Sequence, residues 1–367
     1  MLDDSKIYYS LRDVSIVPAE ISEINSRSEC CPFVSDITGK EDNNYFPLIT
    51  APMSTVIDVD NYKVFQENKI NPIIPRSVII TVRLELCKSI FCAFSLSEIQ
   101  ECFLDDDFKA DKFYVLCDIA NGHMQKEINI LKELKLKYGK NVVKTMGGNI
   151  ANPNTYRYYN EAFVDYVRLG IGGSSVCLTS SNTGVHFCSA SLISETVKVK
   201  QEIQGTTKII ADGGLSSFAD IIKALAIGAD YCMIGSILAK SLESAGKIYK
   251  RKGDAKYIVD DKTKITKEDL KNEEYYKHHY GMSTKEAQRS ILGLTLDNLK
   301  NRKIKTSEGK SEEIRIEYTL AGWCENFESY LRSAMSYCNS YFLNGQFSKR
   351  ARVIINSPTA SSLINNK

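Results

Sequence analysis

The sequence predicts an α/β fold, a (β/α)8 barrel, from three observations. From about residue 113 onward, short apolar runs alternate with segments of helical periodicity, which is typical of parallel strands joined by helices. The apolar runs are nearly continuous, as expected for strands that are buried on both faces. Glycine and polar residues follow at least five successive runs. A doubly wound sheet would gather them at one switch point, whereas a barrel spreads them around its C-terminal face.

The elements of this alternation can be assigned in order. We expect strands at residues 113–117, 142–143, 166–169, 208–211 and 231–234. Apolar residues at helical spacing predict a helix over 124–138, which Gly139 ends. Ser216 and Ser217 can cap a further helix that continues to Leu225.

Composition limits the function classes. The 367 residues are enough for one large α/β domain with a sizeable core, or for two domains. A net charge of +2 gives no global field for binding nucleic acid or an anionic membrane. No apolar run is long enough to cross a bilayer, and the first residues lack the layout of a signal peptide. We therefore expect a cytoplasmic protein.

The cysteines point to a reducing compartment. There are 11, an odd number without CxxC spacing, so a disulfide framework is not expected. The four histidines form no HxxxH pair, which argues against zinc. Ten of the cysteines are best interpreted as small apolar fillers.

Cys177 is different because of its loop. It lies in the segment 170–179, GIGGSSVCLT, directly after the predicted strand 166–169. Glycines there allow tight turns and close approach to a ligand, so we interpret Cys177 as a nucleophile. Asp212-Gly213-Gly214 and Gly235-Ser236 follow two further strands, which predicts one shared site.

We expect residues 1–356 to form a single domain. Within it, the charged segment 250–277 is predicted to be an exposed insertion, and the charged segment 298–315 to be a mobile flap. Residues 357–367 are predicted to be a polar tail.

Several motifs together resemble the IMP dehydrogenase/GMP reductase family, over about residues 11–355. They are DVSIVP at 13–18, Ser26-Arg27, residues 47–56, Gly147-Gly148-Asn149, the Cys177 loop, Asp212-Gly213-Gly214, Gly235-Ser236, YGMS at 280–283 and Glu308-Gly309. The resemblance implies a (β/α)8 barrel, usually a homotetramer. The chain is most similar to the GMP reductase branch. Between residues 76 and 118 there is no room for the CBS modules of most IMP dehydrogenases, and the flap lacks their Arg-Tyr pair. The segments 118–122 and 306–310 also resemble the reductase versions.

The resemblance implies reductive deamination of GMP to IMP and ammonia with NADPH, through a covalent bond between Cys177 and purine C2. Thr179 and Glu308 would relay the proton to the leaving ammonia. The implied substrate-binding residues are Ser175, Asp212, Gly213, Gly214, Gly235, Ser236, Gly281, Met282, Ser283 and Gly309. The implied cofactor-binding residues are Ser26, Arg27, Arg76, Asp118, Ile119, Ala120, Asn149, Ile171, Gly172, Ser333 and Ser336, some of them from a neighbouring subunit.

Family members also bind a monovalent cation such as K⁺ through carbonyls of the Cys loop, here those of Gly172, Ser174 and Cys177. Ser174, Ser180 and Ser54 depart from the family pattern at the cation site and at one further contact. Two alternatives stay open. One is an IMP dehydrogenase without CBS modules, which would oxidise IMP to XMP with NAD. The other is a catalytically silent barrel that binds purine nucleotides.

Overall fold

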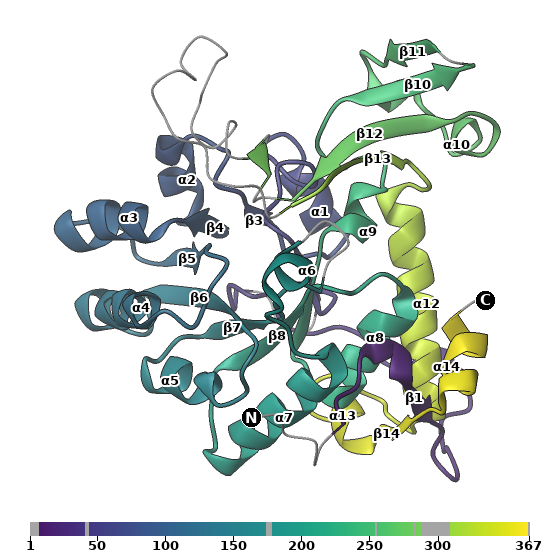
Figure 1. Cartoon of the computed structure of the whole chain (residues 1–367), viewed down its shortest axis with the longest axis horizontal. Coiled ribbons are helices and arrows are strands. Elements are labelled where there is room, and N and C mark those ends of the chain that lie inside the picture. Colours follow the sequence, from purple (N-terminus) through teal and green to yellow (C-terminus); the bar gives the residue numbers. More distant parts are fainter. Residues whose placement is uncertain are drawn as a thin grey trace.

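A computed structural model describes residues 7–40, 44–173, 178–253, 255–281, 284–285, 287 and 309–365. Its centre is a sheet of eight parallel strands, in the order β2-β9-β8-β7-β6-β5-β4-β3. They are β2 (Leu48–Thr50), β3 (Ile73–Ile74), β4 (Phe91–Phe94), β5 (Phe113–Cys117), β6 (Val143–Ile150), β7 (Tyr166–Leu169), β8 (Lys208–Asp212) and β9 (Tyr231–Ile234). A parallel bridge between Ile49 and Asn71, just before β3, joins the two ends of the sheet. The predicted (β/α)8 barrel is confirmed (Figure 1).

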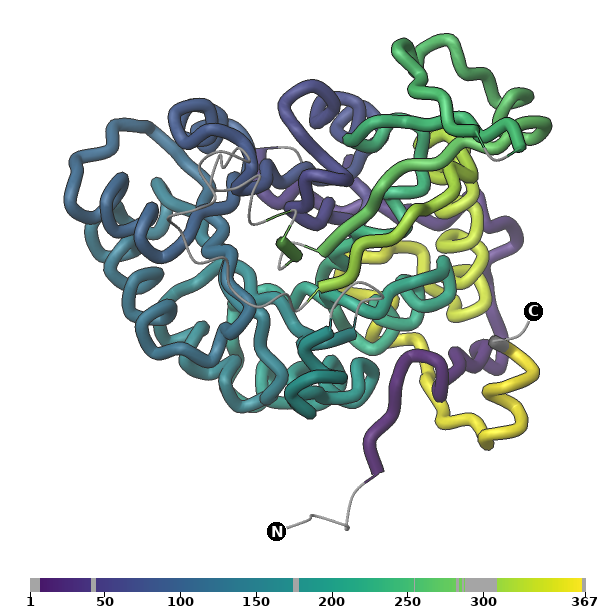
Figure 2. The backbone as a smooth tube through the Cα atoms, turned by 45° about the horizontal axis from the view of Figure 1, so that its top comes forward, coloured from purple at the N-terminus to yellow at the C-terminus, as the bar shows by residue number. Residues whose placement is uncertain are grey.

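Helices cover the outside of the barrel (Figure 2). In chain order they are α1 (Tyr62–Glu67), α2 (Ile80–Leu86), α3 (Leu96–Ile99) with the helical turn η3 (Gln100–Asp105), α4 (Gln125–Tyr138), α5 (Thr155–Glu161), α7 (Ser189–Glu202), α8 (Phe218–Ile227) and α12 (Leu320–Tyr337). The predicted cap of α8 is present, because the Ser217 side chain accepts a hydrogen bond from the Asp220 N–H. Short helices α6 (Thr179–Thr183) and α9 (Ser236–Ala239) follow β7 and β9.

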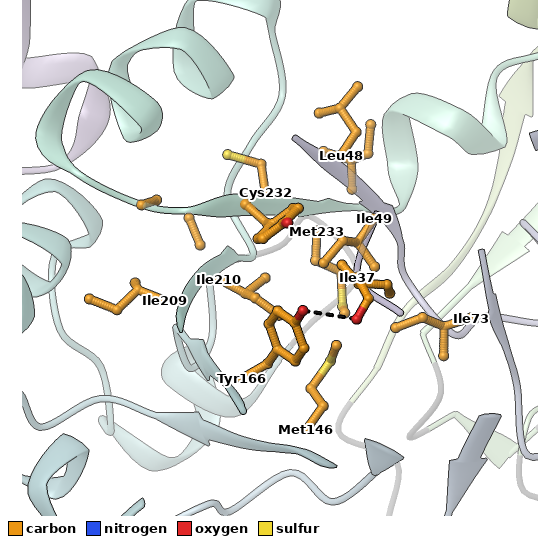
Figure 3. Close-up of a cluster of buried hydrophobic side chains, with 14 of the residues drawn as sticks. Ile37, Leu48, Ile49, Ile73, Met146, Tyr166, Ile209, Ile210, Cys232 and Met233 are labelled. Atoms are coloured by element: carbon orange, nitrogen blue, oxygen red, sulfur yellow. Dashed lines mark hydrogen bonds between the residues drawn. The ribbon is translucent and has the colours of Figure 1, made fainter. Parts of the chain in front are cut away.

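Toward the starts of its strands, the inside of the barrel is a packed core. Met146, Tyr166, Ile210 and Met233 point toward one another there (Figure 3), and Tyr166 Oη donates a hydrogen bond to the Ile37 carbonyl at 2.8 Å. Side chains two residues apart on a strand share a face. Lys208 and Asp212 therefore lie on the same face of β8 as Ile210, Lys208 at its start and Asp212 at its end.

A second, four-stranded antiparallel sheet stands beside the barrel, in the order β11-β10-β12-β13 (Figure 1). It consists of β10 (Ile248–Lys252), β11 (Ala255–Ile258), β12 (Tyr275–Tyr280) and β13 (Ser311–Arg315), and we call it the side sheet. Leu242, Ile248, Ile265, Leu270, Tyr275 and Ile316 form a small apolar core of their own beneath it. Most of the charged segment 250–277 thus belongs to this sheet and to the turn η4 (Lys262–Lys264) and helix α10 (Asp269–Asn272) that connect its strands.

The terminal elements pack against α8 on the outside of the barrel. After the turn η1 (Leu11–Asp13), β1 (Val14–Val17) pairs with β14 (Arg352–Ile355) in an antiparallel ribbon. Helices α13 (Phe347–Arg350) and α14 (Pro358–Asn365) flank β14, and the turn η2 (Arg27–Glu29) contacts α12.

The cysteines are placed as predicted wherever the structure describes them. All ten of these cysteines are free thiols, and seven of them are buried. Burial raises the pKa of most of them, for example that of Cys87 to about 12. Among the described residues, no helix combines the length and the apolar character needed to cross a membrane.

Candidate active site at the mouth of the barrel

Four polar side chains meet at the C-terminal ends of the central strands. Asp118 follows β5, and Asn149 is the penultimate residue of β6. Arg168 lies on β7, and Asp212 is the last residue of β8. Asn149 Nδ2 donates a hydrogen bond to Asp212 Oδ2 at 2.8 Å. The sequence predicted Asp118, Asn149 and Asp212 as site residues, and the structure brings these three together.

Arg168 is the cation at the centre of this group, and its side chain is only 4% exposed. One guanidinium nitrogen, Nη1, lies 3.4 Å from Asp118 Oδ1 and 3.9 Å from Asp212 Oδ2. The other, Nη2, donates to the carbonyls of Gly148 at 2.9 Å and Cys117 at 3.3 Å. Since Arg168 faces two carboxylates, the group carries a net negative charge when both are ionised.

Asp212 is held in a poorly solvated place, with a side chain 17% exposed. Desolvation raises the pKa of its carboxyl, while Arg168 and the hydrogen bond from Asn149 act in the opposite direction and Asp118 adds to the rise. Only Oδ2 accepts the Asn149 bond. Because a carboxylate has two acceptor oxygens, Asp212 can still accept hydrogen bonds from a ligand.

The loop that leads to Cys177 begins directly against Asp212. A Cβ at Gly170, where φ is +127°, would lie 2.1 Å from the Asp212 carbonyl oxygen. A Cβ at Gly173 would lie 3.2 Å from the Gly213 carbonyl carbon. Only glycine permits this approach and this backbone conformation at position 170. The two glycine-containing loops predicted to share a site therefore start in contact.

Two further segments that carry predicted substrate contacts each lie against a neighbouring loop. The Gly281 N–H, at the end of β12, donates a hydrogen bond to the Lys310 carbonyl at 3.2 Å, so Gly281 lies beside the Gly309–Lys310 segment. At the end of β9, a Cβ at Gly235 would lie 2.9 Å from Met53 Sδ. This contact places Gly235 and the following Ser236 against the loop after β2.

Arg76 is a further predicted cofactor residue at the mouth. Its Nη1 donates to the Asp118 carbonyl at 3.4 Å, and its Nε lies 3.8 Å from Glu98 Oε2. Glu98 is also bound by the buried Arg83, through Oε1 at 2.6 Å. Although burial acts to raise the pKa of Glu98, its hydrogen bonds from Arg83 and the Ser95 N–H lower it overall. The Arg76 side chain therefore lies between the Asp118 carbonyl and a carboxylate that Arg83 already binds.

The other predicted cofactor residues fall into two groups. Ile119 and Ala120 lie in the loop after Asp118, and Ile171 and Gly172 lie in the described part of the Cys loop. Ser26 and Arg27, in contrast, lie at η2, next to the C-terminal end of α12 that carries Ser333 and Ser336. Because α12 runs antiparallel to the barrel strands, this second group is at the end of the barrel away from the mouth.

Part of the predicted site lies outside the described residues: Cys177, Glu308, Ser174, Ser175, Met282 and Ser283. Thr179 is described and is the first residue of α6. Of the predicted cation ligands, the Gly172 carbonyl already accepts a hydrogen bond from Ser180 Oγ at 3.0 Å and keeps one lone pair for an ion. No group of three or more His, Cys, Asp or Glu side chains suited to a metal occurs in the part of the chain that the structure describes.

Sequence reasoning missed Arg168. Its signal was a single charged residue inside an otherwise apolar strand, Tyr166-Val167-Arg168-Leu169. A buried charge requires partners, so this position alone pointed to acidic or carbonyl groups on the neighbouring strands.

Comparison with known proteins agrees with the resemblance noted in the sequence. Residues 106–259 match the family model described as IMP dehydrogenase / GMP reductase domain. Over these residues, less than half of its length, the chain is similar to that family. Asp118, Asn149, Arg168 and Asp212 all lie within the matched residues, and the resemblance noted in the sequence is confirmed.

Several curated relatives carry the name GMP reductase. The chain is 27% identical over 224 residues to GMP reductase 2 of Bos taurus, an alignment that covers 61% of this chain and 56% of the bovine protein. It is 28% identical over 255 residues to GMP reductase of Buchnera aphidicola, covering 69% of this chain and 64% of that protein. For GMP reductase of Bacillus cereus the identity is 28% over 253 residues, covering 67% of this chain and 74% of that protein.

Proposed function

We propose that this protein is an NADPH-dependent GMP reductase, which converts GMP to IMP and ammonia. One observation carries the proposal: the stem of the Cys177 loop lies against Asp212, with Gly170 in contact with the Asp212 carbonyl. A carboxylate able to accept ribose hydroxyls is thereby next to the start of a loop that carries a thiol. The relatives named GMP reductase support the same activity.

The carboxylate at Asp212 would orient the nucleotide by accepting its ribose hydroxyls, while Asn149 holds one carboxylate oxygen in place. Ser175, Gly213, Gly214, Gly235 and Ser236 would bind the phosphate through backbone N–H groups and hydroxyls, as in other anion-binding loops. Gly281, Met282, Ser283 and Gly309 would hold the base. This arrangement would place purine C2 near Cys177.

The thiolate of Cys177 would attack C2 and form a covalent bond, and the amino group would leave as ammonia. An amine leaves readily only when protonated, so Thr179 and Glu308 would relay a proton to it. Bound NADPH would supply the hydride that C2 needs after ammonia has left, and the Cys177–C2 bond then breaks to give IMP. Arg76, Asp118, Ile119, Ala120, Asn149, Ile171 and Gly172 would line the cofactor side of the mouth.

The remaining partners are part of the same proposal. Ser26, Arg27, Ser333 and Ser336 would reach a cofactor only in a neighbouring subunit, which fits a homotetramer. A monovalent cation such as K⁺ would bind the carbonyls of Gly172, Ser174 and Cys177. The proposed compartment is the cytoplasm, and no nucleic-acid or membrane partner is proposed.

The test is an absorbance assay of NADPH with GMP, together with direct measurement of ammonia. We expect one ammonia for each NADPH consumed. Cys177→Ala should lower kcat by at least about 1,000-fold, because it removes the nucleophile. Cys188→Ala is the matched control, since Cys188 is a half-buried thiol at the N-cap of α7, and it should keep its activity.

Two other outcomes would overturn the proposal. NADH formation from IMP and NAD, without NADPH loss in the presence of GMP, would make the protein an IMP dehydrogenase. Tight GMP binding without turnover in either assay would make it a nucleotide-binding barrel.

A further inference from the structure

A cavity of about 550 Å³ lies at the end of the barrel away from the mouth. Its walls come from the starts of β8 and β9, the C-terminal part of α7 and the segment 343–349. Lys208 and Asp212 are at opposite ends of β8, roughly 13 Å apart at 3.3 Å per residue. The cavity is therefore separate from the proposed nucleotide site.

The lining of this cavity carries more positive than negative charge. Lys200, Lys208 and Lys349 line it, and Asp230 is its acidic residue. Asp230 is already engaged, because its Oδ2 accepts hydrogen bonds from Lys200 Nζ and from the Ile209 N–H, both at 2.8 Å. Lys208 and Lys349 are left without a counter-charge from the lining.

Lys208 is the key residue because it is a half-buried cation. Its ammonium lies 5.4 Å from the centroid of the Tyr231 ring. Within the described part of the chain, no carboxylate lies within salt-bridge distance of it. Desolvation lowers the pKa of Lys208, and Lys144 and Lys200 add to the effect while Asp230 and Asp165 oppose it. An anion bound beside this partly desolvated cation would therefore be stabilised by it.

The rest of the lining combines apolar and neutral polar side chains. Val34, Val197, Leu225, Ile227 and Leu343 supply the apolar part of the lining, which we call the apolar wall, and Gln204, Asn344 and Ser348 are among the neutral polar residues. A cavity of this size is within the range of small-molecule sites, which combine apolar walls with a few polar groups. Inorganic phosphate would use only the lysines, whereas an organic phosphate could use the wall as well.

We propose that this cavity binds a phosphorylated small organic molecule, with its phosphate on Lys208 and Lys349 and its organic part on the apolar wall. The site does not depend on the proposed reductase activity, because it shares no residue with the mouth. Nothing in the mouth has to be occupied for it to bind.

The test is titration calorimetry of the full chain with ADP and with inorganic pyrophosphate as probes, in the presence of saturating GMP and NADP⁺, so that the proposed substrate and cofactor sites are filled. We expect one site per chain that binds ADP more tightly than pyrophosphate. Lys208→Met should weaken both probes about tenfold or more, since it removes a charge-assisted contact. Lys349→Met, an exposed change on α13, should weaken them as well and tests the site if the β8 variant folds poorly.

Lys198→Met is the matched control. Lys198 is exposed on α7, two residues from Lys200, and it does not line this cavity. It should change affinity by less than about twofold, because exposed charges contribute little. Equal losses in the Lys198 and Lys208 variants, or no binding of ADP at millimolar concentration, would overturn the proposal. Equal affinities for ADP and pyrophosphate would overturn the role of the apolar wall.

Discussion

Lys277 should destabilise the protein at neutral pH, and replacing it should show this directly. It lies in β12 on the face of the side sheet that packs against the barrel, and it is fully buried. Among the described residues, its ammonium makes two long hydrogen bonds, to the carbonyls of Ser241 and Ala245 at 3.4 Å each. Desolvation, with some repulsion from Lys262, lowers the pKa of Lys277 from 10.5 to about 7, against the attraction of Glu243.

The size and sign of the effect follow from that pKa. A fall from 10.5 to about 7 corresponds to about 4–5 kcal/mol at 1.36 kcal/mol per pH unit. Between these two pH values the unfolded chain binds more protons at Lys277 than the folded chain. The free energy of unfolding therefore rises with pH in this window, by up to about 1.4 kcal/mol per unit. Lys277→Met removes this dependence and the cost of the buried charge at pH 7.

The assay is urea unfolding at several pH values from 7 to 10, followed by the fluorescence of Trp323, which is the only tryptophan and is buried. We expect Lys277→Met to be more stable than the unmodified protein at pH 7, with the difference shrinking as the pH rises. Lys271→Met, an exposed change on α10, should leave the pH dependence unchanged. If Lys277→Met and the unmodified protein show the same slope, the reasoning is refuted.

Two further predictions concern the barrel. Burial raises the pKa of Glu127 from 4.5 to about 7. Between these pH values the folded protein binds more protons at Glu127 than the unfolded chain does, so the free energy of unfolding falls as the pH rises. Relative to Glu127→Gln, unfolding measurements should show the unmodified protein losing about 3 kcal/mol across this window, and parallel curves would contradict the pKa. Asp212→Asn should raise the KM for GMP about tenfold or more, because an amide offers one acceptor in place of two. Steady-state kinetics test this, and an unchanged KM would remove Asp212 from ribose binding.

The barrel itself could be predicted because its strands are encoded locally. The apolar runs at 113–117, 166–169 and 231–234 became β5, β7 and β9 with the predicted bounds. Each run is buried on both faces, so its composition alone identifies it. The polar ends of these strands also predicted where Asp118 and Asp212 meet.

The buried charges could not be predicted in the same way. Arg168 is compatible with its strand only because Asp118 and the Gly148 carbonyl lie on neighbouring strands. Lys277 and His279 lie in a stretch whose composition indicates solvent, yet the pairing of β12 with β10 and β13 turns both inward. Such positions depend on contacts between residues far apart in the chain, which a local pattern does not contain.

The buried cysteines have a practical consequence for work on this protein. Nine of the ten described thiols have a raised pKa, chiefly through burial. Alkylating reagents attack the thiolate, so at neutral pH these nine groups react slowly while the chain is folded and quickly once it opens. The uptake of a mass label over time would therefore report opening of the barrel region by region, without any engineered probe.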